Sequence, residues 1–216
     1  MFDLTLSFDN GPEPEATPGV LDVLGRREIK ATFFVIGCKI VDPQRRALAE
    51  RAQEEGHWVG NHTYSHSVPF GRQPDAAIAE SEIARTQALL GDIARPEQLF
   101  RPYGGGGLLD DGLFRPSVLR YLERERYTCV LWNAVPRDWS DPEGWVERGL
   151  AQCRERAWTL MALHDLPSGA MRRLDDFIDR ATQAGARFRQ DFPPDCVPIR
   201  RGEPILPIDA YTSTLQ

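Results

Sequence analysis

The stretch LTLSFDNGPEP, residues 4–14, decides the fold because it shows a buried strand that stops on two polar side chains. Apolar residues alternate with small polar ones along its first half, and Gly11 and Pro12 then prevent the strand from continuing. Asp9 and Asn10 stand at the point where the strand ends. They serve either as ordinary turn residues or as site residues that the strand holds in place.

Alternating strand and helix patterns continue outward from this stretch. Short apolar runs typical of strands occur at 30–37, 57–62, 98–102, 127–132, 158–165 and 186–192. No G-x-G-x-x-G motif follows any of them, so a dinucleotide crevice is not supported. The pattern predicts a parallel α/β fold, either an open doubly wound sheet or a closed barrel.

Helical periodicity separates these strands. Thr17 followed by Pro18 is typical of an N-cap and a first helical turn, and Asp42 starts a second helix. A longer helix is expected to begin at Asp75, with one packing face formed by Ala76, Ala79, Ile83, Thr86 and Leu90.

The length and composition indicate how large a hydrophobic core the chain can form and which classes of binding partner suit its charge. With 216 residues, of which 41% are hydrophobic and 27% charged, the chain is long enough for one well-filled core. A net charge of −6 without any Lys/Arg block argues against nucleic acid or an anionic membrane surface as a partner. The sequence contains no run of about 18 apolar residues, the length that a membrane-spanning helix needs, so no membrane span is predicted. A small or neutral partner is therefore expected.

The two ends of the chain differ from its main body. Prolines accumulate in residues 192–216, which predicts an extension after a catalytic domain at 1–191. This extension forms a strap over the surface, a contact between copies in a homo-oligomer, or a disordered tail. Met1 leads directly into the first strand with no room for a leader, which predicts a cytoplasmic protein, although a chain trimmed of its leader would look identical.

Polar side chains suited to catalysis or metal binding follow most of the expected strands. Parallel folds collect their sites at the carboxyl ends of strands. Three of the four histidines lie at such ends, whereas His57 begins a strand and is expected to be structural. The set comprises Asp9, Asn10, His62, His66, Arg101, Asp138, Trp139 and His164. Their shared position predicts a single site.

His62 and His66 lie four residues apart in the segment NHTYSH. On a helical turn this spacing places both imidazoles on one face, as a zinc site requires. By itself the pair is also compatible with two solvated or core histidines. Asp9, Asn10 and His164 at neighbouring strand ends favour the metal site.

These motifs together resemble the polysaccharide deacetylase family, also called the NodB homology domain or carbohydrate esterase family 4. The family's T-F-D-D-G-P motif corresponds to residues 7–12, and its H-T-x-x-H motif to residues 62–66. Its arginine motif, its D-x-x-D-W motif and its L-x-L-H motif correspond to residues 101–104, 135–139 and 161–164. The resemblance implies a distorted (β/α) barrel with about seven parallel strands. It also implies hydrolysis of N-acetyl or O-acetyl groups on sugars with one divalent metal.

The resemblance also assigns roles to individual residues. Asp9 would be the general base and His164 the general acid, with Arg101 tuning Asp9 and Asp138 orienting His164. His62, His66 and Asn10 would hold the metal, expected to be Zn²⁺, with Co²⁺, Ni²⁺ or Mn²⁺ as alternatives. Substrate contacts would come from Tyr103, Gly104, Trp139 and Leu163.

Three positions depart from the family pattern. Asn10 stands where the family has a second aspartate, and an amide oxygen brings no charge to the metal. The arginine motif has one proline fewer than usual, which leaves open which N–H faces the oxyanion. Val135 replaces the first acid of the D-x-x-D-W motif.

The leading hypothesis is a metal-dependent carbohydrate deacetylase. One alternative is a hydrolase of another small linear amide, such as a formyl or carbamoyl compound. The other alternative is a carbohydrate-binding relative that has no catalytic activity. The only feature that favours it is the loss of a charged ligand at Asn10.

Overall fold

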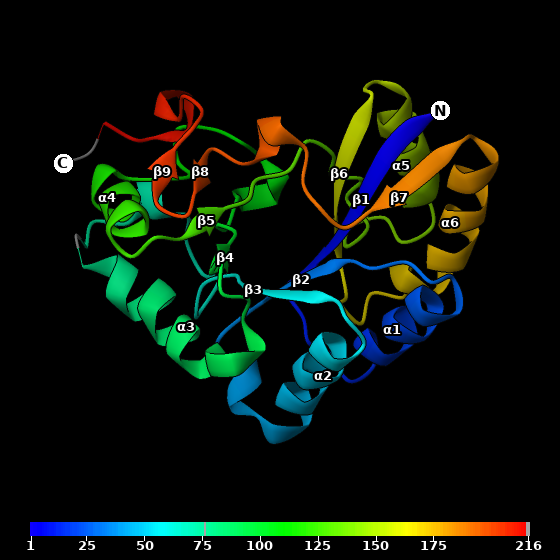
Figure 1. Ribbon diagram of the computed structural model, residues 1–216, viewed down its shortest axis with the longest axis horizontal. Coiled ribbons are helices and arrows are strands. Elements are labelled where there is room, and N and C mark those ends of the chain that lie inside the picture. Colours follow the sequence, from blue (N-terminus) through cyan, green and yellow to red (C-terminus); the bar gives the residue numbers. More distant parts are fainter. Residues whose placement is uncertain (76, 215–216) are drawn as a thin grey trace.

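Seven parallel strands form the centre of the protein, which we describe from a computed structural model covering residues 1–75 and 77–214. The sheet order is β6-β1-β2-β3-β4-β5-β8-β9, with β7 pairing β1, and Figure 1 shows the helices around the outside. The parallel strands are β1 (Phe2–Asp9), β2 (Thr32–Val35), β3 (Trp58–Asn61), β4 (Leu99–Phe100), β5 (Thr128–Cys129), β6 (Trp158–His164) and β7 (Ala186–Arg189). The predicted α/β fold with about seven parallel strands is confirmed.

Strand β1 lies at the centre of this arrangement and sets the register of the site. One edge of β1 pairs with β6 from Asp3 to Asp9. The other edge pairs with β7 in its first half and with β2 in its second half. Asp9 is the register partner of His164 on β6 and of Phe34 on β2. The pairing therefore brings the two proposed proton-transfer residues to the same end of the sheet.

The barrel is distorted where the strands are short. Strands β4 and β5 have two residues each, and the segment after β5 joins β6 through one isolated bridge, between Ala134 and Met161. This bridge brings the segment after β5, which leads to Val135 and Asp138, next to the carboxyl half of β6.

The helices follow the expected order: α1 (Thr17–Arg26), α2 (Pro43–Glu54), α3 (Arg85–Leu90), α4 (Pro116–Arg124), α5 (Trp145–Arg154) and α6 (Leu174–Gln183). Asp42 caps α2 as predicted, because its side chain accepts a hydrogen bond from the Arg45 N–H. The helix expected from Asp75 contains a π-helical turn at Glu80–Ala84 before α3. Ile83 and Leu90 are fully buried as predicted, while Ala76 lies outside the described residues.

The prediction that Thr17 is an N-cap is wrong. The cap position is Ala16, and Thr17 is the first residue of α1. Its buried hydroxyl instead accepts a hydrogen bond from the Glu13 N–H and donates one to the Asp165 carboxylate. Thr17 therefore joins the loop after β1 to the loop after β6.

Residues 193–214 pack against the main body of the protein. Strands β8 (Ile199–Arg200) and β9 (Glu203–Pro204) form an antiparallel pair, and Ile199 pairs Cys129 of β5. The Leu131 N–H donates a hydrogen bond to the Cys196 carbonyl (2.8 Å). The boundary at residue 191/192 and an oligomer contact stay predictions, and residues 215–216 of the tail lie outside the described part.

Within the described residues, no helix combines the length and the apolar character that crossing a membrane requires.

Candidate active site

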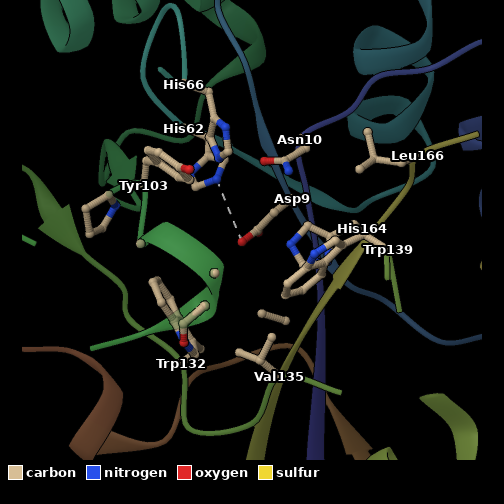
Figure 2. A pocket seen from close by; sticks show the side chains of 15 residues that line it. Asp9, Asn10, His62, His66, Tyr103, Trp132, Val135, Trp139, His164 and Leu166 are labelled. Carbon is tan, nitrogen blue, oxygen red and sulfur yellow. Dashed lines mark hydrogen bonds and ion pairs between the residues drawn. The ribbon is translucent and has the colours of Figure 1, made fainter. Parts of the chain in front are cut away.

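A cavity of about 210 Å³ opens at the carboxyl ends of β1, β3 and β6, where the polar residues were predicted to meet. Figure 2 shows that Asp9, Asn10, His62, His66 and His164 approach it from different elements. Tyr103, Gly104 and Trp139 also line it. One cavity thus receives eight of the eleven residues predicted for the site.

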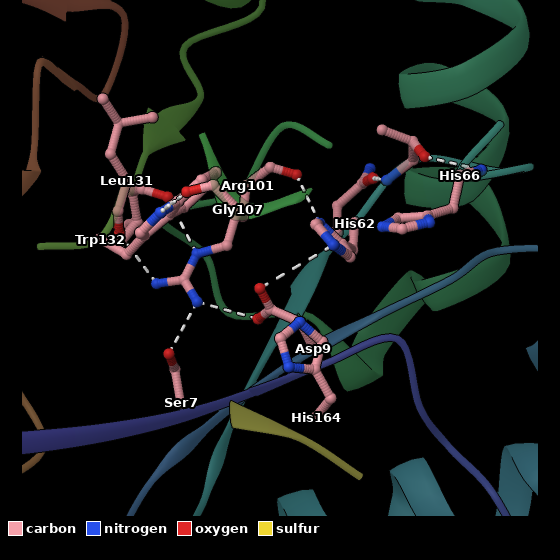
Figure 3. A network of polar contacts seen from close by, with 12 residues as sticks. Ser7, Asp9, His62, His66, Arg101, Gly107, Leu131, Trp132 and His164 are labelled. Carbon is pink, nitrogen blue, oxygen red and sulfur yellow. Dashed lines mark hydrogen bonds and ion pairs between the residues drawn. The ribbon is translucent and has the colours of Figure 1, made fainter. Parts of the chain in front are cut away.

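Arg101 holds the carboxylate of Asp9 from behind the cavity (Figure 3). Its guanidinium is fully buried and donates to Asp9 Oδ1 (2.9 Å) and to Ser7 Oγ (2.7 Å). Its remaining N–H groups donate to the carbonyls of Val130 and Leu131. Asp9 Oδ1 is therefore engaged, while Oδ2 lies 3.9 Å from His62 Nε2.

His62 is a buried and His66 a half-buried neutral imidazole. The His62 Nδ1–H donates to the Arg101 carbonyl (2.8 Å), which leaves the Nε2 lone pair free to bind a cation. Burial lowers the pKa of His62 to about 3, and burial together with the neighbouring His62 lowers the pKa of His66 to about 2. The ring centroids lie 4.7 Å apart. Both rings are therefore unprotonated near neutral pH, the form that binds metals.

Asn10 offers an oxygen without a partner at the same cavity. Its Oδ1 atom is buried and accepts no hydrogen bond from any described residue, and Figure 2 shows the side chain turned toward the two histidines. Its φ of 74° is uncommon for a residue other than glycine, and such strain is typical of functional sites. Two imidazoles and one unpartnered amide oxygen fit a divalent cation.

No group of three or more His, Cys, Asp or Glu side chains suited to a metal occurs in residues 1–75 and 77–214. The amide at Asn10 explains this, because the third candidate ligand is neither an acid nor a histidine.

His164 is fixed by the fully buried Asp138. Its Nδ1–H donates to Asp138 Oδ1 and its backbone N–H to Asp138 Oδ2, both at 2.9 Å. Burial alone would lower the pKa of His164, but the hydrogen bond and charge of Asp138, helped by Asp9 and Asp165, raise it above its ordinary value. Trp139 packs edge-on against the ring at 4.5 Å. The imidazole thus keeps Nε2 for the cavity and favours its protonated form.

Comparison with known proteins agrees with this geometry. The sequence model described as polysaccharide deacetylase matches residues 3–113. The chain belongs to this family. A chitooligosaccharide deacetylase of Bradyrhizobium is 33% identical over 180 residues, covering 81% of this chain and 76% of the relative. A peptidoglycan-N-acetylglucosamine deacetylase of Bacillus cereus is 33% identical over 142 residues, covering 64% of this chain and 61% of the relative.

A solved structure extends the comparison to the fold. The family 4 acetyl xylan esterase of Clostridium thermocellum, in complex with a cobalt ion, superposes with a TM-score of 0.68 at 28% identity, covering 87% of both chains. The predicted resemblance to the polysaccharide deacetylase family, whose named members here are carbohydrate deacetylases and esterases, is confirmed.

The family's arginine motif forms one rim of the cavity. Neither the Tyr103 nor the Gly104 N–H donates a hydrogen bond to any acceptor in the described chain, so both remain available to an oxyanion. Tyr103 packs on His66 with a centroid distance of 3.9 Å. A Cβ atom at Gly104 would lie 2.6 Å from the Trp132 ring, so the close approach requires glycine.

Leu163 does not line the cavity. It is fully buried in the apolar core cluster that includes residues of β1 and α1, because alternate residues of β6 point to opposite faces of the sheet. Its neighbours Ala162 and His164 face the cavity, and Leu166 follows them. This could have been predicted from the sequence, because every second residue of a strand points to the same side of the sheet. Ala162, and not Leu163, therefore shares the side of His164.

Sequence reasoning also missed Trp132 as a wall of the cavity. Its Nε1–H donates to the Gly107 carbonyl (3.1 Å), which fixes the glycine-rich loop beside the site. Its place in the last expected residues of the strand at 127–132 was the available signal.

Proposed function

We propose that this protein is a metal-dependent hydrolase that removes the N-acetyl group, or an O-acetyl group, from an amino sugar in a carbohydrate chain. The observation that carries this proposal is the convergence of Asp9, the two neutral histidines, the unpartnered Asn10 oxygen and His164 on one cavity. The names of the family relatives, which include two N-acetyl-sugar deacetylases, support the substrate class.

His62, His66 and Asn10 would hold the metal, with Zn²⁺ expected because imidazole nitrogens suit it. When bound, the metal supplies Lewis acidity that polarises the acetyl carbonyl and makes water a usable nucleophile near neutral pH. The remaining steps belong to side chains and backbone groups of this chain.

Asp9 Oδ2 takes the proton from the attacking water, while Arg101 keeps the carboxylate oriented through Oδ1. The tetrahedral oxyanion accepts a hydrogen bond from the N–H of Tyr103 or Gly104. His164 then gives its Nε2 proton to the departing amine, and Asp138 stabilises the imidazolium. Because the two proton-transfer groups have different partners, an arginine for Asp9 and a carboxylate for His164, they divide the base and acid roles.

The cavity favours a short acyl group. Leu166, Val135 and Ala162 give it an apolar wall beside the reacting groups. An acetyl methyl fits such a wall without leaving a polar group unpartnered.

Asn10→Asp is expected to tighten Zn²⁺ binding by at least about tenfold, or near 1.4 kcal/mol. The carboxylate would place a full negative charge where Asn10 now offers a dipole, and the two side chains have nearly the same shape. Lys39, whose Nζ donates to the Asn10 backbone carbonyl (2.6 Å), would also stabilise that charge. Competitive chelator titration measures the change. Gln183→Glu, an exposed position at the end of α6, adds the same charge away from the cavity and is the control. Equal affinities of wild type and Asn10→Asp would place residue 10 outside the ligand set.

Asp138→Asn is expected to move the alkaline limb of the kcat/KM profile to lower pH. His164 acts as an acid only while protonated, so activity is lost as the pH rises through its raised pKa. Asparagine keeps an acceptor for the His164 N–H but removes the charge that raises this pKa. Rate measurements across the neutral and alkaline range test this expectation, and an unshifted limb would remove Asp138 from this role.

The proposed function is tested by acetate release from N-acetylglucosamine oligomers, with the metal content of the purified chain determined in parallel. We expect both a bound divalent metal and acetate release. Metal without acetate, but with turnover of formyl or carbamoyl amides, would show the small-amide alternative. Absence of both metal and turnover would show the non-catalytic relative.

A further inference from the structure

Charged side chains hold the loop after β1, which carries Asn10. Three successive backbone carbonyls of this loop, those of residues 10, 11 and 12, accept hydrogen bonds from residues 36–45. The donors are Lys39 Nζ to Asn10 (2.6 Å), the Ile36 N–H to Gly11 (3.1 Å) and Arg45 Nη1 to Pro12 (3.0 Å). Two of the three donors are therefore cations, one on each side of the Gly11 carbonyl.

Glu13 pairs with both cations. Its side chain is buried, and its carboxylate forms one ion pair with Lys39 through Oε1 and a second with Arg45 through Oε2, the latter at 2.5 Å. No other acid in residues 1–75 and 77–214 forms an ion pair with either cation. Burial alone would raise the pKa of Glu13, but the hydrogen bonds from Arg45 and Lys39 lower it, so the carboxylate is charged near neutral pH.

The position of Lys39 makes this compensation important for a metal. Its ammonium lies 2.6 Å from the backbone oxygen of Asn10, whose side chain is a proposed ligand without charge of its own. A positive charge so close to the site repels a divalent cation unless a negative charge offsets it. Glu13 provides that charge from outside the cavity, which it does not line.

We propose that Glu13 is a positioning residue for the metal site. It holds Lys39 and Arg45 against the backbone of the loop that carries Asn10, and it compensates their charge. Glu13 acts through these two cations and not as a ligand, because both of its carboxylate oxygens are engaged away from the cavity. This inference rests on the proposed function for the presence of a divalent metal at Asn10.

Glu13→Gln is expected to lower the affinity for Zn²⁺ roughly threefold to tenfold. Glutamine keeps the shape and one acceptor oxygen but removes the charge, so that Lys39 and Arg45 lose their compensation. Glu13→Asp keeps the charge on a shorter side chain and is expected to retain most of the affinity. Competitive chelator titration measures these affinities without turnover, and circular dichroism establishes that each variant is folded.

Glu15→Gln is the matched control. Glu15 belongs to the same loop, but it is exposed. Its replacement removes the same charge from the chain and is expected to leave the affinity for Zn²⁺ at the wild-type value. A role of Glu13 in stability alone would lower the melting temperature of the metal-free protein without changing the affinity of the folded protein for Zn²⁺.

A double-mutant cycle tests whether Glu13 acts through Lys39. Lys39→Gln removes the cation that lies against the Asn10 carbonyl. In this background, Glu13→Gln is expected to change the affinity for Zn²⁺ clearly less than it does in the wild-type protein, because residues that act together have non-additive effects.

Three results would overturn the inference: wild-type affinity for Zn²⁺ in folded Glu13→Gln, an equal loss of affinity in Glu15→Gln, or an undiminished effect of Glu13→Gln in the Lys39→Gln background. The expected affinities without acetate release by the wild-type protein would instead overturn the proposed function and leave the role of Glu13 standing. A wild-type protein that binds no Zn²⁺ would overturn both.

Discussion

Asp9→Asn is expected to lower kcat by at least roughly 10²–10⁴-fold while the metal content stays that of the wild type. Asparagine has the shape of aspartate, and its amide oxygen still accepts the hydrogen bond that Arg101 now donates to Oδ1. The group that faces the cavity then becomes an NH₂, which takes no proton from water. The measurement is kcat together with elemental analysis of the same preparation.

Asp3→Asn is the matched control for this change. Asp3 lies at the opposite end of β1 and is also paired with arginines, Arg187 at 2.6 Å and Arg189 at 3.1 Å. Its replacement is expected to affect stability alone. Turnover of Asp9→Asn within tenfold of wild type would remove Asp9 as the base.

His164→Ala is expected to lower kcat by roughly 10²–10⁴-fold, the usual effect of losing general acid help. Metal content is expected to stay unchanged, because the ring is held by Asp138 and not grouped with His62 and His66. His57→Ala is the control: His57 is also buried, but its ring accepts a hydrogen bond from the Ala31 N–H away from the cavity. Loss of the metal in His164→Ala would make His164 a ligand instead of the acid.

The sequence was most informative where strand ends and motifs coincide. Asp9, His62 and His164 were placed together from one rule, the gathering of sites at the carboxyl ends of parallel strands. The register of β1 with β6 then brings Asp9 and His164 side by side. Their roles as base, ligand and acid stay predictions until the variants are measured.

Side chain direction was less predictable. Leu163 was assigned to the substrate site from a motif, yet strand alternation turns it into the core and presents Ala162 and His164 instead. Thr17 has the composition of an N-cap, but its hydroxyl bonds to Asp165, which is distant in sequence. A hydrogen bond between residues so far apart in the sequence cannot be predicted from local helix propensity.

The structure of the C-terminal segment, residues 192–216, could also not be predicted from the sequence. Its prolines are typical of a strap, a contact surface or a disordered tail alike. The pairing of Ile199 with Cys129 depends on an exposed edge of β5, which no local pattern in residues 192–216 reveals.

The most direct test of a metal-dependent deacetylase is acetate release from N-acetylglucosamine oligomers before and after removal of the metal. We expect the chelated protein to lose acetate release and to regain it when about one equivalent of Zn²⁺ per chain is added, with His62→Ala failing to recover. Acetate release that persists at full rate in the metal-free protein would contradict the proposed mechanism.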